Sequence, residues 1–403
     1  MTKISRRSFA ASVTAAAATP TWAAGPTPKG AIIKRFEVFP TGVEFRSTFR
    51  IGRGVVGGRS TVGRYVFLKL ETADGQVGWG ATNTVPSWSY ETAESVTSTL
   101  QHHLCPLAVG RSPFELNTIK RLMDQTITNA VSNGAPFAKS ALEIALLDLA
   151  GQVSGQPVHQ MLGGKVHPTV ELCFALSIDE PEAMAGEARK FPACKCFKVK
   201  VAGQPETDLR RVRLVTEARP DAQLIMDPNQ SYQPLALVRF LDGLRQFPMV
   251  RCIEQPVRSE DYMALKRARE RSPVPVAIDE GAFSAFDVVR AARLEVADLL
   301  VLKVPKSGGV TNALKTAMVA EANGMGLLGS GLTDAGVSFM AAIHLYSTLD
   351  TLLPCELNGP QFLADMMVEG IEMEGVTVKV PDTPGLGIRV PEDKLRAARL
   401  KLG

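Results

Sequence analysis

The chain has 403 residues, of which 45% are hydrophobic and 21% charged, values typical of a globular protein that folds in water. Its formal net charge of +4 includes Lys3, Arg6 and Arg7 at the N-terminus, so the rest of the chain carries only about +1. This near-neutral balance and the lack of a Lys/Arg run argue against nucleic acid as a partner. No segment reaches the roughly 18 unbroken apolar residues of a membrane span, so we expect no membrane helix.

The first residues are predicted to form a targeting segment. Residues 5–9 carry a twin-arginine signature, and a short apolar stretch follows over residues 10–18. Thr21-Trp22-Ala23 then offers a small-x-small cleavage site. We therefore expect residues 1–24 to be a twin-arginine signal peptide and the mature protein to be periplasmic.

The next part of the chain, residues 30–165, predicts an α+β domain. Residues 66–80 read as two strands joined by an Asp-Gly turn, which indicates a hairpin. Apolar residues at helical spacing predict a helix from about Pro136 to Gln152. An antiparallel sheet followed by helices belongs to the α+β class.

From residue 166 to 353 the pattern changes to strands that alternate with helices. Short apolar runs separate six amphipathic segments, at residues 182–190, 206–219, 234–244, 261–271, 285–294 and 310–322. Such βα repetition predicts a parallel barrel. Residues 354–403 are rich in Gly and Pro, and we expect them to leave the barrel and pack back on the first domain.

Five charged residues recur at the spacing of one barrel repeat, each at the end of an apolar run. From Lys200 the steps are 27 residues to Asp227, 27 to Glu254, 25 to Asp279 and 24 to Lys303. A strand, a crossover helix and two short loops occupy about that length. Strand C-termini meet at one mouth of a barrel, so three acids and several amines are predicted to surround one pocket.

The acids Asp227, Glu254 and Asp279 offer only oxygen ligands. Converging carboxylates repel one another unless a cation neutralises them, and an all-oxygen donor set favours Mg²⁺ or Mn²⁺ over zinc. Asn229 lies two residues after Asp227 and is expected to face the same side, where it could bind metal-bound water or substrate. Glu280 could reach a neighbouring lysine from the strand end.

The amines suit proton transfer at carbon. Lys198 and Lys200 are one residue apart, so both face the same side of their strand. At the barrel mouth, partial desolvation and a nearby metal ion would lower the pKa of a lysine and make it available as a base. Lys303 comes from a strand roughly across the barrel, so two amines would flank a bound carboxylate. The metal ion would stabilise the enolate formed when the α-proton leaves.

With these residues in place, the chain resembles the enolase superfamily and, within it, the muconate-lactonizing subgroup of muconate cycloisomerases. The matching segments are Lys198-x-Lys200, Asp227-x-Asn229, Glu254-Gln255-Pro256, Asp279-Glu280, Lys303 with Lys306-Ser307-Gly308-Gly309, the helix 137–148, and residues 355–360 and 363–365. The resemblance implies an α/β fold, a modified (β/α)7β TIM-type barrel with an α+β capping domain. It also implies a homo-oligomer, often an octamer in this family.

The resemblance implies roles for individual residues. Asp227, Glu254 and Asp279 would be ligands of Mg²⁺ or Mn²⁺, and Lys200 the general acid/base. Lys198 would assist it and contact the substrate carboxylate. Lys303 would lie on the opposite face of the substrate, and Glu356 in the pocket.

Three functions fit this pattern. The first is a cycloisomerase that closes cis,cis-muconate to a lactone. The second is an epimerase or racemase of dipeptides or amino-acid derivatives, which would use two lysines. Dipeptide epimerases usually carry an Asp-x-Asp pair near the end of the barrel, and residues 331–336 lack it. The third is a carboxylate-binding protein without catalysis.

Substrate choice is expected from two loops of the capping domain, at residues 45–58 and 84–90. Arg46, Arg50 and Arg53 in the first loop could hold a second carboxylate of the substrate. Trp88 and Tyr90 in the second could shape the pocket. Arg46 is the arginine that we predict to bind substrate.

Overall fold

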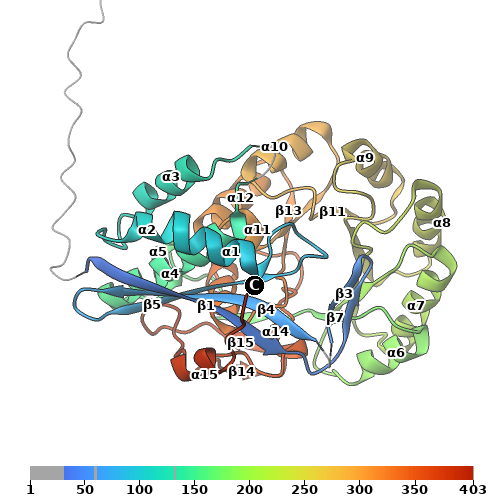
Figure 1. Cartoon of the computed structure of the whole chain (residues 1–403). Coiled ribbons are helices and arrows are strands. Elements are labelled where there is room, and N and C mark those ends of the chain that lie inside the picture. Colours follow the sequence, from blue (N-terminus) through green and yellow to red (C-terminus); the bar gives the residue numbers. More distant parts are fainter. Residues whose placement is uncertain (1–30, 59–60, 131–132, 403) are drawn as a thin grey trace, which may run out of the picture.

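The structure, a computed structural model, describes residues 31–58, 61–130 and 133–402 (Figure 1). The expected signal peptide lies outside the described residues. Within the described part of the chain, no helix combines the length and the apolar character that crossing a bilayer requires.

The capping domain is built on a three-stranded antiparallel sheet, in the order β1-β4-β5. The predicted hairpin joins β4 and β5, and its turn uses Gly75 at φ +88°, a backbone conformation that glycine tolerates best. A small separate hairpin, β2–β3, projects toward the barrel. The strands are β1 (Ile33–Glu44), β2 (Phe49–Ile51), β3 (Gly54–Gly57), β4 (Val62–Thr72) and β5 (Val77–Thr84).

A central helix, α4 (Pro136–Ser154), packs on this sheet and agrees with the predicted helix at its start. Residues 136–151 are buried on all sides, as expected of a helix enclosed within a fold. No side chain of its own caps the N-terminus. Glu91 caps it instead, because its carboxylate accepts hydrogen bonds from the backbone N–H groups of Phe137 (2.8 Å) and Ala138 (3.3 Å). The other helical segments here are α1 (Ala93–Thr99), the π-helix η1 (Leu100–Leu104), α2 (Cys105–Ala108), α3 (Leu116–Thr126) and α5 (Val158–Met161).

The second domain confirms the predicted barrel class. In the described chain, seven parallel strands follow one another in sequence order around a single sheet, and helices form the outer layer around it (Figure 1). The strands are β7 (Phe174–Leu176), β8 (Cys196–Lys200), β9 (Gln223–Asp227), β10 (Val250–Glu254), β11 (Val276–Ile278), β12 (Leu299–Leu302) and β13 (Gly326–Gly329).

Six helices of the barrel begin and end within one residue of the six predicted segments, and two more, at residues 304–307 and 336–346, were not predicted. Proline at the first position of several of them fixes the start, because its missing N–H is one that a helix leaves unbonded there. The helices are α6 (Pro181–Arg189), α7 (Pro205–Ala218), α8 (Pro234–Leu244), α9 (Tyr262–Arg271), α10 (Ala285–Leu294), α11 (Val304–Ser307), α12 (Val310–Ala322) and α13 (Gly336–Tyr346).

A two-residue segment closes the barrel between its first and last strands. Cys355 forms a parallel bridge with Leu172, just before β7, and Glu356 forms one with Ser330, just after β13. The barrel therefore extends past residue 353, where we had expected it to end. This segment is too short to show a strand-like apolar pattern, so its position depends on pairing with both neighbours.

The C-terminal segment returns to the capping domain. The backbone N–H of Gly42 in β1 donates to the carbonyl of Ala398, and that of Leu400 donates to the carbonyl of Pro40, both at 2.8 Å. A second small sheet joins the tail to the start of the barrel domain, in the order β14-β15-β6. The remaining elements are β6 (Thr169–Glu171), α14 (Gly359–Phe362), β14 (Met373–Glu374), β15 (Thr377–Lys379) and α15 (Glu392–Ala397).

Candidate active site

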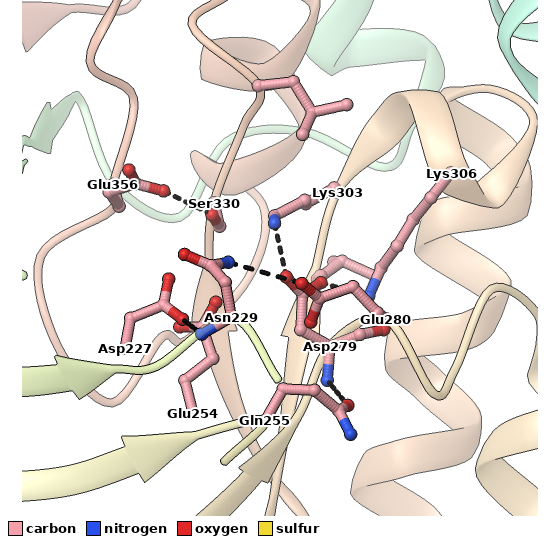
Figure 2. Close-up of polar contacts among 12 residues, drawn as sticks. Asp227, Asn229, Glu254, Gln255, Asp279, Glu280, Lys303, Lys306, Ser330 and Glu356 are labelled. Carbon is pink, nitrogen blue, oxygen red and sulfur yellow. Dashed lines mark hydrogen bonds and ion pairs between the residues drawn. The ribbon is translucent and has the colours of Figure 1, made fainter. Parts of the chain in front are cut away.

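The structure brings the five spaced residues to one mouth of the barrel. Lys200, Asp227 and Glu254 are the last residues of β8, β9 and β10, and Asp279 and Lys303 directly follow β11 and β12. All five are at most 5% exposed. Figure 2 shows the three carboxylates at the ends of adjacent strands, with Lys303 facing them.

Each of the three carboxylates lies against a lysine. The Nζ of Lys200 is 2.5 Å from Oδ2 of Asp227, and the Nζ of Lys303 is 2.5 Å from Oδ2 of Asp279. Lys198 does not line the substrate cavity described below, and its Nζ lies 2.8 Å from Oε2 of Glu254. The lysine side chains therefore neutralise the acids. We had assigned that role to a metal ion alone.

The electrostatics of the acids follow from this packing. Burial and then the neighbouring Asp227 carboxylate raise the pKa of Glu254 to about 8. For Asp279, burial alone would raise the pKa, but the ammonium groups of Lys303 and Lys306 lower it below its usual value. The central acid thus resists ionisation, while Asp279 is held as a carboxylate.

Burial and the neighbouring carboxylates act in opposite directions on the pKa of the buried lysines. Burial is the largest influence on Lys303 and would lower its pKa, but the carboxylates of Asp279, Glu254 and Glu280 together outweigh burial and raise it. For Lys198, the carboxylates of Glu254, Glu356 and Asp227 together outweigh burial in the same way. Only Lys306, of these three, has a lowered pKa, and burial is the main cause.

The donor chemistry of the acids fits a hard divalent cation. Among the described residues, no three Asp, Glu, His or Cys side chains are arranged to hold one ion, so the set of metal ligands stays a prediction. Both oxygens of Glu254 are nevertheless buried without an aligned hydrogen bond, even though Lys198 is close to one of them. A buried carboxylate whose oxygens accept no hydrogen bond can use them to bind a cation.

Two residues without an assigned role in our sequence analysis hold Asp279 in place. The Nζ of Lys306 donates to the backbone carbonyl of Asp279 (2.7 Å) and to its Oδ1 (2.8 Å). The Oε1 of Gln255 accepts from the backbone N–H groups of Asp279 (2.9 Å) and Gly281 (3.0 Å). The spacing of three between Lys303 and Lys306 was the available signal, since one helical turn places such residues on the same face.

Asn229 lies beside the acids, as predicted. Its backbone N–H donates to Oδ1 of Asp227 (2.9 Å), and its side-chain oxygen accepts from Lys200 (3.2 Å). Its Nδ2 donates to Oε1 of Glu280 (3.3 Å). We had considered a lysine as the partner of Glu280, but the hydrogen bond is to this amide. Asn229 has φ +44°, which turns the chain back over the strand end.

Glu356 enters the same site from the segment that closes the barrel. Its Oε2 accepts from the hydroxyl of Ser330 (2.6 Å) and lies 3.2 Å from the Nζ of Lys198. Its Oε1 accepts from the Nδ2 of Asn358 (2.8 Å). Three donors thus hold this carboxylate at the edge of the cavity.

A cavity of about 30 Å³ lies between the barrel mouth and the capping domain. Lys200 and Lys303 both reach it, and each has an aromatic ring nearby: the Nζ of Lys200 is 5.7 Å from the ring centre of Phe49, and that of Lys303 is 4.4 Å from the ring centre of Trp88. The lining residues are Phe49, Ile51, Val56, Val85, Trp88, Lys200, Asn229, Lys303, Gly331, Leu332, Thr333, Glu356 and Asn358.

The contact between Arg46 and substrate stays a prediction, and the structure places Arg46 outside the lining of the cavity. Arg46 is exposed, and its Nε donates to the backbone carbonyl of Leu363 (2.7 Å). Alternation along the chain turns the neighbouring Phe45 and Phe49 inward, so the arginine faces out. Tyr90 also lies outside the cavity; it is 58% exposed and its ring is stacked with that of Phe283.

Comparison with known proteins identifies the family. The model for "Mandelate racemase / muconate lactonizing enzyme, N-terminal domain" matches residues 43–163. The model for "Enolase C-terminal domain-like" matches residues 182–394, which span the strands that carry the five spaced residues. The chain belongs to the enolase superfamily. Within it, the chain falls in the muconate-lactonizing subgroup, so both the predicted family and the predicted fold class are confirmed.

Several enolase-superfamily enzymes are similar over most of the chain. N-succinyl-L-Arg/Lys racemase of Bacillus cereus is 32% identical and covers 82% of this chain and 89% of its own. D-Ala-D/L-Ala epimerase of Cytophaga hutchinsonii is 32% identical, and the match covers 90% of this chain and 97% of the epimerase. Chloromuconate cycloisomerase of Pseudomonas putida is 31% identical, with 82% and 90% covered.

Solved structures give the same result. Muconate lactonizing enzyme from Pseudomonas fluorescens, complexed with muconolactone, has a TM-score of 0.86 at 27% identity and covers 92% of this chain and all of its own. A dipeptide epimerase from Cytophaga hutchinsonii, complexed with Mg and D-Ala-L-Val, has a TM-score of 0.84 at 29% identity, with 91% and 98% covered. Overall similarity therefore does not separate racemase, epimerase and cycloisomerase, and the choice depends on the site.

Proposed function

We propose that the protein is a metal-dependent racemase or epimerase that moves a proton at the α-carbon of a carboxylate substrate. The observation that carries the proposal is the position of Lys200 and Lys303, which line one small cavity from β8 and β12. Two amines on different sides of one substrate can serve its two faces, and inversion at carbon requires that.

We further propose that the cation is Mg²⁺ and that Asp227, Glu254 and Asp279 bind it. The buried oxygens of Glu254 without an aligned hydrogen bond support this choice, as does the all-oxygen donor set. The similar dipeptide epimerase from Cytophaga hutchinsonii binds Mg. Bound there, the ion would supply stabilisation of the enolate charge.

The side chains of the chain itself account for the proton movement. A neutral Lys200 takes the α-proton from one face of the substrate, and a protonated Lys303 donates a proton to the other face. One C–H bond breaks, one forms, and the substrate leaves with inverted configuration. Phe49 and Trp88 cover the two amines and keep water away, so the removed proton is not lost to solvent.

The test is face-specific exchange of the α-proton with D₂O in the presence of Mg²⁺. Lys200→Ala should abolish exchange of one enantiomer and spare that of the other, and Lys303→Ala should do the reverse. Lys195→Ala is the matched control, because this lysine precedes β8 and lies exposed beside Asp221. If both variants lose exchange of the same enantiomer only, the two-base assignment is wrong.

A muconate-type cycloisomerase is the second candidate, and one observation favours it over dipeptide epimerisation. In the loop after β13, Asp334 is buried and does not line the cavity, so it is not placed to bind the ammonium group of a substrate there. Loss of the diene absorbance of cis,cis-muconate, with Lys200→Ala inactive and Lys303→Ala still turning over, would select this reaction.

A further inference from the structure

The capping-domain helix α4 contacts the barrel through one buried carboxylate. Resting on the proposed function, we infer that Glu143 is a positioning residue, which fixes the short helix α11 and with it Lys303 and Lys306. Lys303 directly precedes α11, and Lys306 lies within it. The capping domain therefore sets the geometry of one of the two faces of the site.

Glu143 supplies the cap that α12 lacks. This helix begins after Gly309, which has no side chain to bond the free N–H groups of the first turn. The Oε2 of Glu143 accepts from the backbone N–H of Thr311 (3.3 Å), and its Oε1 accepts from the hydroxyl of Thr311. The Nζ of Lys120, in α3, lies 3.2 Å from the same Oε1. A carboxylate at the N-terminus of a helix also interacts favourably with the helix dipole, so the start of α12 is anchored to α4.

The chain between α11 and α12 passes directly against this carboxylate. Gly308 and Gly309 have φ +80° and +126°, which are backbone conformations that glycine tolerates best. A Cβ at position 309 would overlap Oε2 of Glu143. The two glycines therefore allow the turn after α11 to lie in contact with the carboxylate.

The loop before α4 holds α11 at a second point. The Nδ2 of Asn133 donates to the backbone carbonyls of Lys306 (3.2 Å) and Phe283 (2.8 Å). Lys306 and Lys303 both contact the carboxylate of Asp279, at 2.8 and 2.5 Å (Figure 2). Contacts from α4 and from the loop before it thus meet on the turn that carries both lysines.

Burial makes the contacts of Glu143 sensitive to position. Its side chain is fully buried, and a buried carboxylate that loses its donors is costly. A shift of the turn away from α4 would leave the carboxylate without the two donors of Thr311. The charge on Glu143 therefore opposes that shift, and a neutral amide in its place would oppose it less.

Lys200, the other proposed base, is held by different elements. Its Nζ contacts Asp227, at the end of β9, and Asn229, in the loop that follows. A change in α4 should therefore displace Lys303 and leave Lys200 in place. This asymmetry separates a positioning role from a general contribution to stability, which would affect both faces alike.

The first experiment compares the two faces in Glu143→Gln, which keeps the size of the side chain and removes its charge. The Mg²⁺-loaded enzyme is tested in D₂O with N-succinyl-arginine and with Ala-Ala, each in both configurations at the reacting α-carbon. Exchange of the enantiomer that requires Lys303 should fall about 10-fold or more, because small displacements of reacting groups lower rates steeply. Exchange of the enantiomer that requires Lys200 should stay within about twofold of wild type. Equal losses for both enantiomers would overturn the inference.

Asp148→Asn is the matched control for this comparison. Asp148 is a second buried carboxylate of α4, but it accepts from the backbone N–H groups of Trp79 (2.7 Å) and Leu386 (2.8 Å), away from α11. Its loss should leave the ratio of the two exchange rates unchanged. A ratio altered as in Glu143→Gln would contradict a specific role of Glu143.

Amide hydrogen exchange of the enzyme without substrate tests the inference independently of the reaction. In Glu143→Gln, the backbone amides of residues 304–313 should exchange about 10-fold faster, the effect of one lost hydrogen bond to a charged group, and those of β8 should not change. Thr311→Val, which removes only the hydroxyl donor, should give the same pattern at smaller size and serves if Glu143→Gln does not fold. Unchanged amide exchange at residues 304–313 would overturn the inference whatever the turnover. If the wild-type enzyme exchanges the α-proton of neither compound, that result counts against the proposed function, and the amide exchange still decides the role of Glu143.

Discussion

The substitution Gly52→Ala should displace the β2–β3 hairpin that forms the cavity wall. Gly52 lies in the turn of this hairpin, against the loop after β9 that carries Asn229. A Cβ at position 52 would overlap the backbone carbonyl oxygen of Pro228 and lie 3.1 Å from the Cβ of Ser231. Backbone atoms on both sides limit the relief that side-chain rotation can give, so the hairpin must move.

The size of the effect follows from this overlap. Restoring ordinary contact requires a shift of about 1 Å, and such overpacking costs about 1–3 kcal/mol. Phe49, Ile51 and Val56 would move with the hairpin, and a misplacement of about 1 Å near reacting groups lowers rates by about 100-fold. We therefore expect a large loss in kcat/KM and a modest fall in Tm.

The assay is α-proton exchange in D₂O together with thermal unfolding. Val55→Ala is the matched control in the same hairpin, because Val55 is 51% exposed and does not line the cavity. If Gly52→Ala stays within about twofold of wild type in kcat/KM, the hairpin does not set the geometry of the substrate site, and the reasoning fails.

Three further outcomes are expected. Lys306→Met should weaken Mg²⁺ binding about 10- to 100-fold in calorimetric titration, because the change removes the lysine that holds the Asp279 carboxylate. Lys315→Met, a change at an exposed lysine, is the control and should leave the affinity for Mg²⁺ unchanged. Equal affinities in the two variants would contradict the proposal that Lys306 positions Asp279. Burial raises the pKa of Glu91 from 4.5 to about 7. The folded state therefore keeps a proton that the unfolded state loses between those values, and the free energy of unfolding should fall by about 3 kcal/mol as pH rises through that window. Glu91→Gln should remove this component in urea titrations, and an unchanged pH slope would refute it. Chelation with EDTA should abolish turnover and added Mg²⁺ restore it, with Glu254→Gln needing more Mg²⁺; turnover in the chelated enzyme would exclude the proposed metal.

The strand-end residues could be predicted because barrel geometry converts sequence spacing into spatial proximity. Asp227, Glu254 and Asp279 each end an apolar run, and parallel strands deliver such ends to one mouth. Six of the barrel helices could also be predicted, because their apolar periodicity is a local signal. In these parts of the chain, local pattern and tertiary position agree.

The parts that sequence reasoning missed depend on contacts between distant segments. Arg46 is sequence-adjacent to cavity residues, but its direction depends on a hairpin whose pairing no short pattern reveals. The segment at Cys355 is too short to register as a strand. The pairing of each acid with a lysine depends on side-chain geometry within the site, and residue type alone does not determine it.

The two ends of the described chain meet, and this has a consequence for biosynthesis. Residues 398 and 400 bond to β1, and residues 355 and 356 are the last to join the barrel wall. A nascent chain therefore stays without its sealed catalytic framework until residues 355–400 have left the ribosome. Native contacts of such long sequence separation form slowly, so closure of the barrel is expected to be a late step of folding.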